Sequence, residues 1–244
     1  MDLSVVVPVK DEEENIAPLI KEICSALDGL LDYEIVYVDD GSSDKTWERL
    51  VAMSAKLSQL KIVRHRKSCG QSTAIYTGVK AARAPLVATL DGDGQNDPAD
   101  IPRLLEVFDS SDSPVGLQLV IGHRRKRQDS WLKRISGRVA NRVRGYLLKD
   151  RTPDTGCGLK LFPRETFLDL PFFDHMHRFL PALIIRSGGA VLSVPVNHRP
   201  RKHGQSHYGI WDRLWVGLVD LLGVMWLQRR RKTAEIEEVT NFES

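Results

Sequence analysis

Short apolar runs rich in Val, Ile and Leu alternate with helix-like segments through the first ninety residues of the chain. The helix-like segments repeat their apolar positions every three or four residues, whereas the short runs are continuously apolar, as in strands buried on both faces. Strands and helices alternating at this spacing form right-handed βαβ units, so we predict an α/β fold with a mainly parallel sheet flanked by helices. The predicted strands are residues 3–9, 34–38, 61–63 and 86–90, and the predicted helices are residues 11–30, 44–57 and 70–82.

The first and third of these helices carry local signals of their own. Asp11, with Glu14 three residues later, is typical of a helix N-cap, so we expect the first helix to begin at Asp11. The third helix has a small residue at every fourth position, which predicts close packing on the sheet. No GxxxxGK[ST] or GxGxxG motif accompanies it, which disfavours a P-loop or a dinucleotide-binding site. The small residues are Gly70, Ala74, Gly78 and Ala82.

The second half of the chain is less regular and more basic. Residues 118–122 predict a fifth strand, and a basic segment with helical periodicity follows as far as residue 148. Its apolar row consists of Trp131, Ile135, Val139 and Val143, and the basic row beside it consists of Arg134, Arg138 and Arg142. The pattern fits a helix docked on the core with a solvated charged face. It fits equally a helix that rests on anionic lipid or gates a phosphate-bearing substrate.

An apolar stretch near the C-terminus, residues 214–227, raises the question of a membrane. As a helix it spans about 21 Å, short of the roughly 30 Å hydrocarbon core of a bilayer, and Asp220 interrupts it. Four cations follow at residues 229–232. We therefore predict an amphipathic helix that lies on the membrane surface with its basic end on anionic lipid. The alternative is a helix packed on the core or on a second subunit of a homo-oligomer.

Composition indicates the domain organisation and the compartment. The 244 residues suffice for one large α/β domain (1–208), followed by the interface helix (209–232) and a polar tail (233–244) that we expect to be disordered. Three widely spaced cysteines without a CxxC pair, and a start without a secretory signal, indicate a cytoplasmic protein that is peripheral at the inner face of the cell membrane.

Charge is segregated along the chain. Residues 11–50 contain twelve Asp and Glu against three Lys and Arg, whereas residues 123–151 contain eleven Lys and Arg against two Asp. Such segregation suggests that different faces meet different partners. Because the acidic half would repel a long polyanion, we do not expect nucleic acid to be a partner.

Candidate chemistry lies where three of the predicted strands end, in the loops at residues 8–12, 39–42 and 91–95. The carboxyl ends of parallel strands meet at one edge of a sheet, where ligands bind. In the third loop Asp91 and Asp93 are separated by Gly92, which keeps bulk away from an incoming ligand. Paired carboxylates are typical ligands of a hard divalent cation shared with nucleotide phosphates. The alternative is a plain acidic turn, but three such loops at one edge favour a nucleotide site.

Seven motifs follow one another along residues 3–208. They are Val5-Val6-Val7-Pro8 with Glu12, Val38-Asp39-Asp40-Gly41-Ser42, the small-residue row from Gly70 to Gly78, Asp91-Gly92-Asp93-Gly94-Gln95, Gly122-His123-Arg124, Asp154-Thr155-Gly156-Cys157-Gly158-Leu159-Lys160-Leu161-Phe162, and Arg201-Lys202-His203-Gly204-Gln205-Ser206-His207-Tyr208. In this order they resemble a family 2 glycosyltransferase with the GT-A fold. The last two motifs resemble its polyprenyl-phosphate branch, which is related to dolichol-phosphate mannose synthase.

The resemblance implies a role for many of these residues. Those expected to line the donor nucleotide pocket are Pro8, Lys10, Glu12, Val38, Asp40, Asp91, Gly92 and Asp93, with Asp40 close to the base or ribose. Asp91, Asp93 and Gln95 would hold Mg²⁺ or Mn²⁺ against the diphosphate. The residues expected to bind phosphate of the donor or acceptor are Arg124, Arg201, Ser206 and His207. Asp93, Arg124 and Arg201 are the expected catalytic residues.

The chain departs from the family pattern at three places. Val9-Lys10-Asp11 stands where relatives often carry an aromatic residue and Asn, Gly92 stands where Ala is common, and His207 stands where Lys is common. The run from Asp174 to Arg178 fits a polar helix start, with a supporting part in the acceptor site as the alternative for His177 and Arg178.

One absence bears on the acceptor. The second half shows neither a Glu-Asp base nor a Gln-x-x-Arg-Trp motif. A hydroxyl acceptor needs its proton removed, whereas a lipid phosphate is already an anionic nucleophile. The absence of a base therefore favours a phosphate acceptor.

These observations predict a metal-dependent, inverting glycosyltransferase at the cytoplasmic membrane face. It would move a sugar from a nucleoside-diphosphate sugar, UDP- or GDP-linked with UDP favoured, to a polyprenyl (undecaprenyl or dolichyl) phosphate. A same-fold enzyme that glycosylates a hydroxyl of a saccharide or lipid is the nearest alternative. A sugar nucleotidyltransferase and a non-catalytic, membrane-bound nucleotide-binding module are alternatives from other classes.

Overall fold

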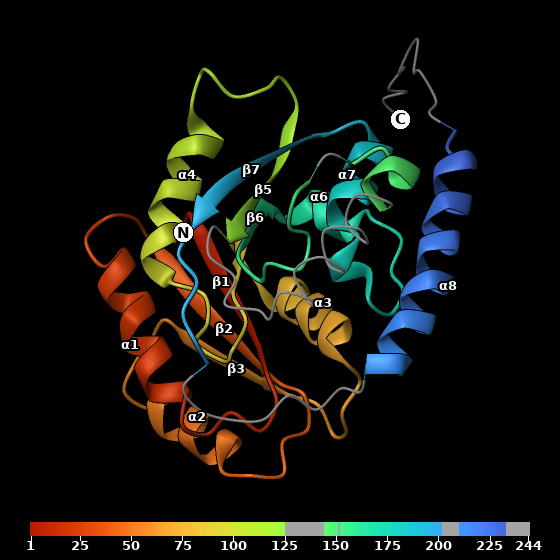
Figure 1. The fold of residues 1–244 in the computed structure, drawn as a ribbon. Coiled ribbons are helices and arrows are strands. Elements are labelled where there is room, and N and C mark those ends of the chain that lie inside the picture. Colours follow the sequence, from red (N-terminus) through yellow and green to blue (C-terminus); the bar gives the residue numbers. More distant parts are fainter. Residues whose placement is uncertain (125–143, 151, 202–209, 233–244) are drawn as a thin grey trace, which may run out of the picture.

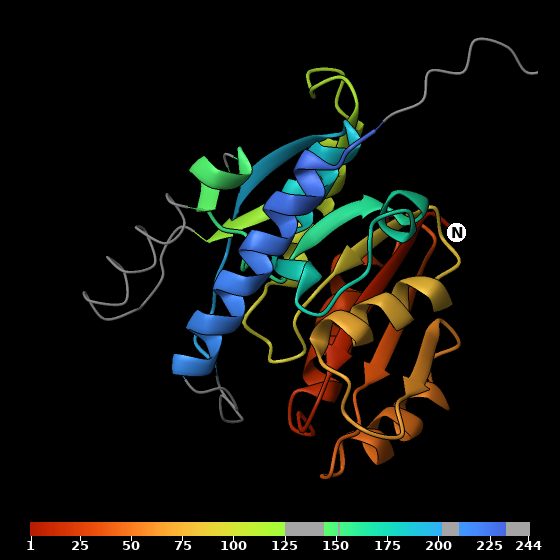
Figure 2. The same cartoon turned by 90° about the vertical axis from the view of Figure 1, so that its right-hand side faces the viewer.

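The fold is a three-layer sandwich with one mixed β-sheet between two layers of helices (Figures 1 and 2). The computed structural model describes residues 1–124, 144–150, 152–201 and 210–232. The predicted basic segment lies outside these ranges except for its end, where residues 144–148 are helical, and the predicted tail lies outside them entirely.

The sheet has seven strands in the order β3-β2-β1-β4-β6-β5-β7. β6 runs antiparallel to both of its neighbours, and the other described strands are parallel to one another. The carboxyl ends of the parallel strands therefore meet at one edge, together with the start of β6. The strands are β1 (Leu3–Val9), β2 (Tyr33–Asp39), β3 (Leu60–Arg64), β4 (Leu86–Thr89), β5 (Leu117–Arg124), β6 (Lys160–Pro163) and β7 (Ala190–Val196).

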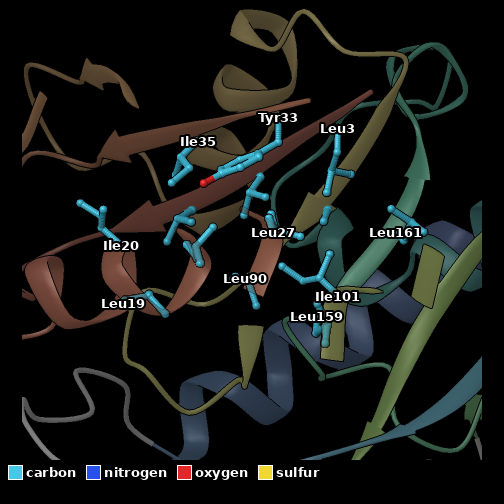
Figure 3. Close-up of a cluster of buried hydrophobic side chains, with 14 of the residues drawn as sticks. Leu3, Leu19, Ile20, Leu27, Tyr33, Ile35, Leu90, Ile101, Leu159 and Leu161 are labelled. Atoms are coloured by element: carbon cyan, nitrogen blue, oxygen red, sulfur yellow. The ribbon is translucent and has the colours of Figure 1, made fainter. Parts of the chain in front are cut away.

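Each face of the sheet is covered by its own set of helices, which appear on opposite sides of the sheet in Figure 1. One face carries α1 (Ile16–Leu27), α2 (Thr46–Ser54) and α4 (Ile101–Asp109), with the 3₁₀ turn η1 (Pro98–Asp100) before α4. The other face carries α3 (Gln71–Ala81), α6 (Arg164–Leu168), η2 (Met176–Arg178), α7 (Leu180–Ser187) and α8 (Ile210–Arg229). Figure 3 shows the core beneath the first set, where Leu19 and Ile20 of α1 face Ile35 and Leu90.

The five predicted strands are confirmed. The central strands β1 and β2 show why the apolar runs were a reliable signal. Every residue of β1 and β2 is buried, as expected for strands covered by helices on both faces. β6 and β7 were not predicted. β6 has only four residues, and its pairing with β4 and β5 joins segments far apart in the chain.

The predicted N-cap at Asp11 is wrong, because α1 begins at Ile16 with Asn15 as its N-cap residue. Asp11 instead has a left-handed backbone, with φ of 53°. Its carboxylate accepts hydrogen bonds from the backbone N–H and the hydroxyl of Ser43. Residues 11–15 thus wrap around the loop after β2 before the helix starts, which joins the first two strand ends.

The small-residue row of α3 packs on the sheet as predicted. Ala74, Gly78 and Ala82 are buried, and a Cβ on Gly78 would overlap the side chain of Val6 in β1. Gly70 has a different role, because it precedes α3 with φ of 89°, a backbone conformation that favours glycine. Close approach of α3 to β1 and β2 brings the first turn of this helix to the functional edge of the sheet.

The C-terminal helix α8 has two different faces. Leu221 and Val224 are buried in the core shared with α7, and Asp220 contacts His175, with 3.1 Å between Oδ2 and Nδ1. The residue that interrupts the apolar stretch therefore faces a partner on the protein. The outer face exposes Leu218, Val219, Leu222 and Trp226. Among the described helices, none combines the length and hydropathy that crossing a bilayer requires.

We expect Gly78→Ala to lower the free energy of unfolding, although alanine is the better helix former. The added methyl would meet stiff, fully buried Val6, and such overpacking costs about 1–3 kcal/mol. Gly223→Ala in α8 is the matched control, because nothing lies within 4 Å of a Cβ there. Urea unfolding should show Gly78→Ala destabilised and Gly223→Ala unchanged or slightly more stable. Equal stability of the two variants would contradict the close packing.

Candidate active site

The loops at the carboxyl ends of β1, β2 and β4 converge on one edge of the sheet, as the sequence predicted, and Arg124 ends β5 at the same edge. Two further segments join them: the loop before β6, which carries Asp154 and Gly158, and the chain after β7, which ends the described range at Arg201. Hydrogen bonds made by Glu12, Asp91, Arg124 and Arg201 connect these segments. Ser206 and His207 lie outside the described residues.

Asp91 is fixed from three directions. Its backbone N–H donates to Asn96 Oδ1 (3.1 Å), and Gln71 Nε2 donates to its Oδ1 (2.8 Å) from the first turn of α3. Gly158 lies directly against the carboxylate, and a Cβ at that position would overlap it. Any larger residue at position 158 would clash with the Asp91 carboxylate, so the glycine is what allows the carboxylate to lie there.

The surroundings of Asp91 disfavour the ionised form of its carboxylate. Burial raises its pKa to about 6, and the nearby charge of Asp93 contributes in the same direction. Lys160 and Arg124 act in the opposite direction without cancelling these effects. Lys160, at the start of β6, is itself buried with its ammonium bonded to the Cys157 carbonyl, and burial lowers its pKa. Because burial and mutual repulsion disfavour two ionised carboxylates here, an added cation would bind favourably between them.

Asp93 and Gln95 continue the same loop, residues 91–95, which we call the metal loop after the cation site that the sequence predicts there. Asp93 Oδ1 accepts a hydrogen bond from the backbone N–H of Gln95 (3.1 Å). The side-chain nitrogen of Gln95 donates to the carbonyl of Arg199 (3.4 Å), in the chain after β7. Gln95, a predicted metal ligand, therefore also ties the metal loop to that segment.

The two predicted phosphate-binding arginines are each paired with a carboxylate. Arg124 makes a bidentate contact with Asp154, with Nε–Oδ2 2.6 Å and Nη2–Oδ1 2.8 Å, and the pair raises the arginine's pKa despite the opposing effect of burial. Arg201 bonds to Glu12, whose other oxygen accepts from Asn15 (2.6 Å). Burial raises the pKa of Glu12, with the charge of Asp93 adding to the effect, which places Glu12 beside the metal loop.

Two predicted nucleotide residues have structural surroundings that the sequence did not indicate. Val38 is fully buried beneath α3, where its side chain packs toward Gly78 and the core. Asp40 accepts four hydrogen bonds, and together these outweigh burial and lower its pKa. The donors are His65 Nδ1, Ser68 Oγ, Cys69 N and Gly70 N. Asp40 therefore builds the loop that leads into α3.

The remaining predicted residues of the first loop differ in exposure. Pro8 is buried, and its carbonyl lies close to the position that a Cβ on Gly92 would take. Lys10 is exposed. Gly92 itself is buried against Val9, so the two loops after β1 and β4 are in direct contact.

Sequence reasoning missed several residues of this edge. Gln71 and Asn96 hold Asp91, Asp154 holds Arg124, and Lys160 supplies a buried positive charge. Asp154 and Lys160 belong to the motif from Asp154 to Phe162, so their place in that motif was the signal that could have marked them as site residues. Gln71 directly follows Gly70, but nothing in its local sequence indicates a contact with Asp91.

His177 occupies a buried structural position in η2. Its Nδ1 lies 2.7 Å from Ser72 Oγ, and the same hydroxyl accepts from the His177 backbone N–H (3.3 Å). Burial lowers the pKa of His177, so the ring is neutral. It fastens η2 to the first turn of α3.

A second group of potential metal ligands lies beside Asp40. Ligand atoms of Asp40, His65 and Cys69 lie within 4.8 Å of one another. However, both ring nitrogens of His65 already have partners, Asp40 and Thr77. Asp91 and Asp93 stay the predicted metal ligands, and the raised pKa of Asp91 shows that positive charge is lacking beside it.

Comparison with known proteins identifies the family. The family model described as Glycosyl transferase family 2 matches residues 4–170. The chain belongs to this family of sugar-transferring enzymes. The prediction from the ordered motifs is therefore confirmed.

Two curated members of the family are similar over most of this chain. The dodecaprenyl-phosphate galacturonate synthase of Rhizobium johnstonii is 34% identical, over 94% of this chain and 68% of the relative. The undecaprenyl-phosphate 4-deoxy-4-formamido-L-arabinose transferase of Edwardsiella ictaluri is 35% identical, over 85% of this chain and 63% of the relative. The chain thus spans about two thirds of the length of these relatives.

A solved structure shows the same fold. Glucosyl-3-phosphoglycerate synthase from Mycobacterium tuberculosis, in complex with Mn²⁺, UDP-glucose and phosphoglyceric acid, superposes with a TM-score of 0.69 at 20% identity. The match covers 93% of this chain and 79% of that one. The GT-A architecture of this family 2 member is therefore confirmed.

We expect Asp91→Asn to stabilise the metal-free protein while removing metal binding. The folded-state pKa of Asp91 lies above the ordinary value, so its ionised form destabilises the fold above about pH 6. That penalty, about 1–3 kcal/mol, decreases as the pH falls below 6. Asparagine can still accept from Gln71.

Thermal unfolding at pH 8 without metal, alongside Mn²⁺ titration, checks this expectation. Asp109→Asn, at the exposed end of α4, is the control that should change neither quantity. An Asp91→Asn protein that is less stable than the parent, or that binds Mn²⁺ with parental affinity, would refute the assignment.

Proposed function

We propose that this family 2 glycosyltransferase transfers a sugar, with inversion, from a nucleoside-diphosphate sugar to a polyprenyl phosphate at the cytoplasmic face of the membrane. The observation that carries the proposal is the pair Asp91 and Asp93 at the sheet edge, with Lys160, Arg124 and Arg201 around it. Carboxylates that hold a cation, together with nearby fixed cations, suit a diphosphate leaving group. The names of both curated relatives, a dodecaprenyl-phosphate and an undecaprenyl-phosphate enzyme, support the lipid acceptor.

The residues present fit a divalent cation. Asp91 and Asp93 offer carboxylate oxygens, the ligand type preferred by Mg²⁺ and Mn²⁺, and the raised pKa of Asp91 marks a position where positive charge is lacking. The fold relative was solved with Mn²⁺ and UDP-glucose, which supports the same choice of cofactor and donor class. Such a cation supplies Lewis-acid neutralisation of charge on the departing diphosphate. Gln71 and Asn96 would hold Asp91 in its ligating position.

The carboxylates at this edge favour an acceptor that needs no general base. Asp154 is engaged by Arg124, and Glu12 by Arg201 and Asn15. These partners occupy carboxylate oxygens that would otherwise be available to accept a proton from a hydroxyl acceptor. A phosphate acceptor arrives already ionised and can attack the anomeric carbon directly, while the chain's arginines bind and orient phosphate oxygens.

The outer face of α8 supports contact with the membrane. Leu222 is 57% and Trp226 59% exposed, and both stand one or two turns before the cations at residues 229–232. Exposed aromatic and aliphatic side chains next to a basic cluster suit an anionic bilayer surface. The inner face of α8 packs on α7, so this surface stays attached to the catalytic domain.

A donor screen tests the reaction. UDP- and GDP-linked sugars are each incubated with undecaprenyl phosphate, with Mn²⁺, with Mg²⁺ or with a chelator. We expect one donor to be consumed only when metal and lipid phosphate are both present, and Asp93→Asn to lose at least about a hundredfold in kcat. Asp109→Asn should retain parental turnover. Full activity of Asp93→Asn, or of the parent in the chelator, would exclude the metal assignment.

Substitution on α8 tests the membrane surface without uncovering the core. The double variant Leu222→Ser, Trp226→Ser should bind anionic vesicles about tenfold or more weakly, because two exposed apolar side chains are lost. Val51→Ser, a comparable exposed apolar change on α2, is the control. Vesicle sedimentation measures binding, and analytical ultracentrifugation measures assembly. Unchanged vesicle binding, with a dimer lost in the double variant, would show that this face binds a second subunit.

A further inference from the structure

The five residues after β7, residues 197–201, form a strap across the metal loop. Asn96 and His198 make an antiparallel β-bridge, and the backbone N–H of Arg199 donates to the Gln95 carbonyl (3.0 Å). The Gln95 side chain returns a hydrogen bond to the Arg199 carbonyl. The backbone N–H of Asn197 donates to Asp100 Oδ2 (2.7 Å). The strap is thus attached along its length to the segment that directly follows Asp93.

The side chain of Arg199 fastens this strap with both arms of its guanidinium. Nη1 lies 2.7 Å from Glu22 Oε2 on α1, and Nη2 lies 2.6 Å from Asp97 Oδ1 just after the metal loop. A planar guanidinium that bridges two carboxylates fixes direction as well as distance. Arg199 therefore joins three segments: the strap, the metal loop and α1.

Two residues further along, the strap delivers Arg201 to the site, where it bonds to Glu12 of the first loop. Glu12 feels the charge of Asp93, so Arg201 ends beside the metal-binding carboxylates. The attachments at Gln95, Asn96 and Asp97 therefore set the distance between the metal loop and Arg201. A donor diphosphate has to reach a cation on Asp91 and Asp93 and also the Arg201 guanidinium, so this distance matters to its binding.

We propose that Arg199 is a positioning residue for the donor site: it holds the metal loop and Arg201 in one fixed arrangement, so that metal and donor diphosphate are bound together. This inference rests on the proposed function, because it assumes a metal-bound diphosphate donor. Arg199 acts through the strap and does not touch the substrate.

A purely structural Arg199 would be a surface ion pair, and such pairs contribute little. The two roles differ in what they change. Loss of a structural ion pair lowers stability and leaves ligand affinities alone, whereas loss of a positioning contact weakens metal and donor binding in a folded protein. Arg103 offers a matched control, because its Nη1 donates to the Pro195 carbonyl (3.0 Å) from α4, next to the strap but without a contact to the metal loop.

The experiment compares the full chain with Arg199→Ala, Arg199→Lys, Glu22→Ala and Arg103→Ala. Electron paramagnetic resonance of free Mn²⁺ gives the metal affinity with and without UDP, and initial rates give KM and kcat for the donor found in the screen. Circular dichroism during heating gives stability. Glu22→Ala removes only the α1 side of the clamp and leaves the metal loop untouched, so it remains informative where Arg199→Ala unfolds.

We expect Arg199→Ala to weaken Mn²⁺ binding in the presence of UDP about fivefold or more and to raise the donor KM similarly, as for coupled neighbours. Glu22→Ala should show the same effects to a smaller degree, Arg199→Lys should recover part of the loss, and Arg103→Ala should show none. Parental metal affinity and KM in both Arg199→Ala and Glu22→Ala would overturn the inference while the proposed function stands. A parent that binds neither Mn²⁺ nor UDP would overturn both.

Discussion

The repulsion between Asp91 and Asp93 at the end of a buried strand is the constraint on which the rest of this edge depends. Two carboxylates are held close together where burial raises the pKa of Asp91 to about 6. The surrounding groups hold them in place without neutralising them: Gln71 and Asn96 by hydrogen bonds, Lys160 and Arg124 by charge. A site that is costly for the empty protein and relieved by a cation is typical of functional positions, where stability is given up for binding.

The architecture that creates this constraint was largely readable from the sequence. Continuous apolar runs predicted the buried parallel strands, and parallel strands bring their carboxyl ends together by geometry alone. The position of Asp91 and Asp93 at the sheet edge therefore follows from the sequence pattern. The N-cap at Asp11 failed because a side chain that can cap a helix can equally bind a neighbouring loop, as Asp11 does with Ser43.

Contacts between distant segments could not be predicted from the sequence. Gln71 and Asp91 are twenty residues apart, and Arg199 and Glu22 are 177 apart, so no local pattern could pair them. Val38 shows the same limit, since a residue at the end of a strand can face the ligand edge or the core beneath α3. Asp220 likewise interrupts the apolar stretch of α8, and its contact with His175, far away in the sequence, helps to orient this helix.

The central claim is that the sugar is transferred to an anionic phosphate, and the linkage in the product tests it most directly. The lipid product formed from the active donor and undecaprenyl phosphate is isolated and examined by phosphorus NMR, with proton coupling at the anomeric carbon. The account predicts a single phosphodiester joining lipid and sugar, with the anomeric configuration opposite to that of the donor and a nucleoside diphosphate as the second product. A retained configuration, a sugar on a hydroxyl group, or release of nucleoside monophosphate would contradict it.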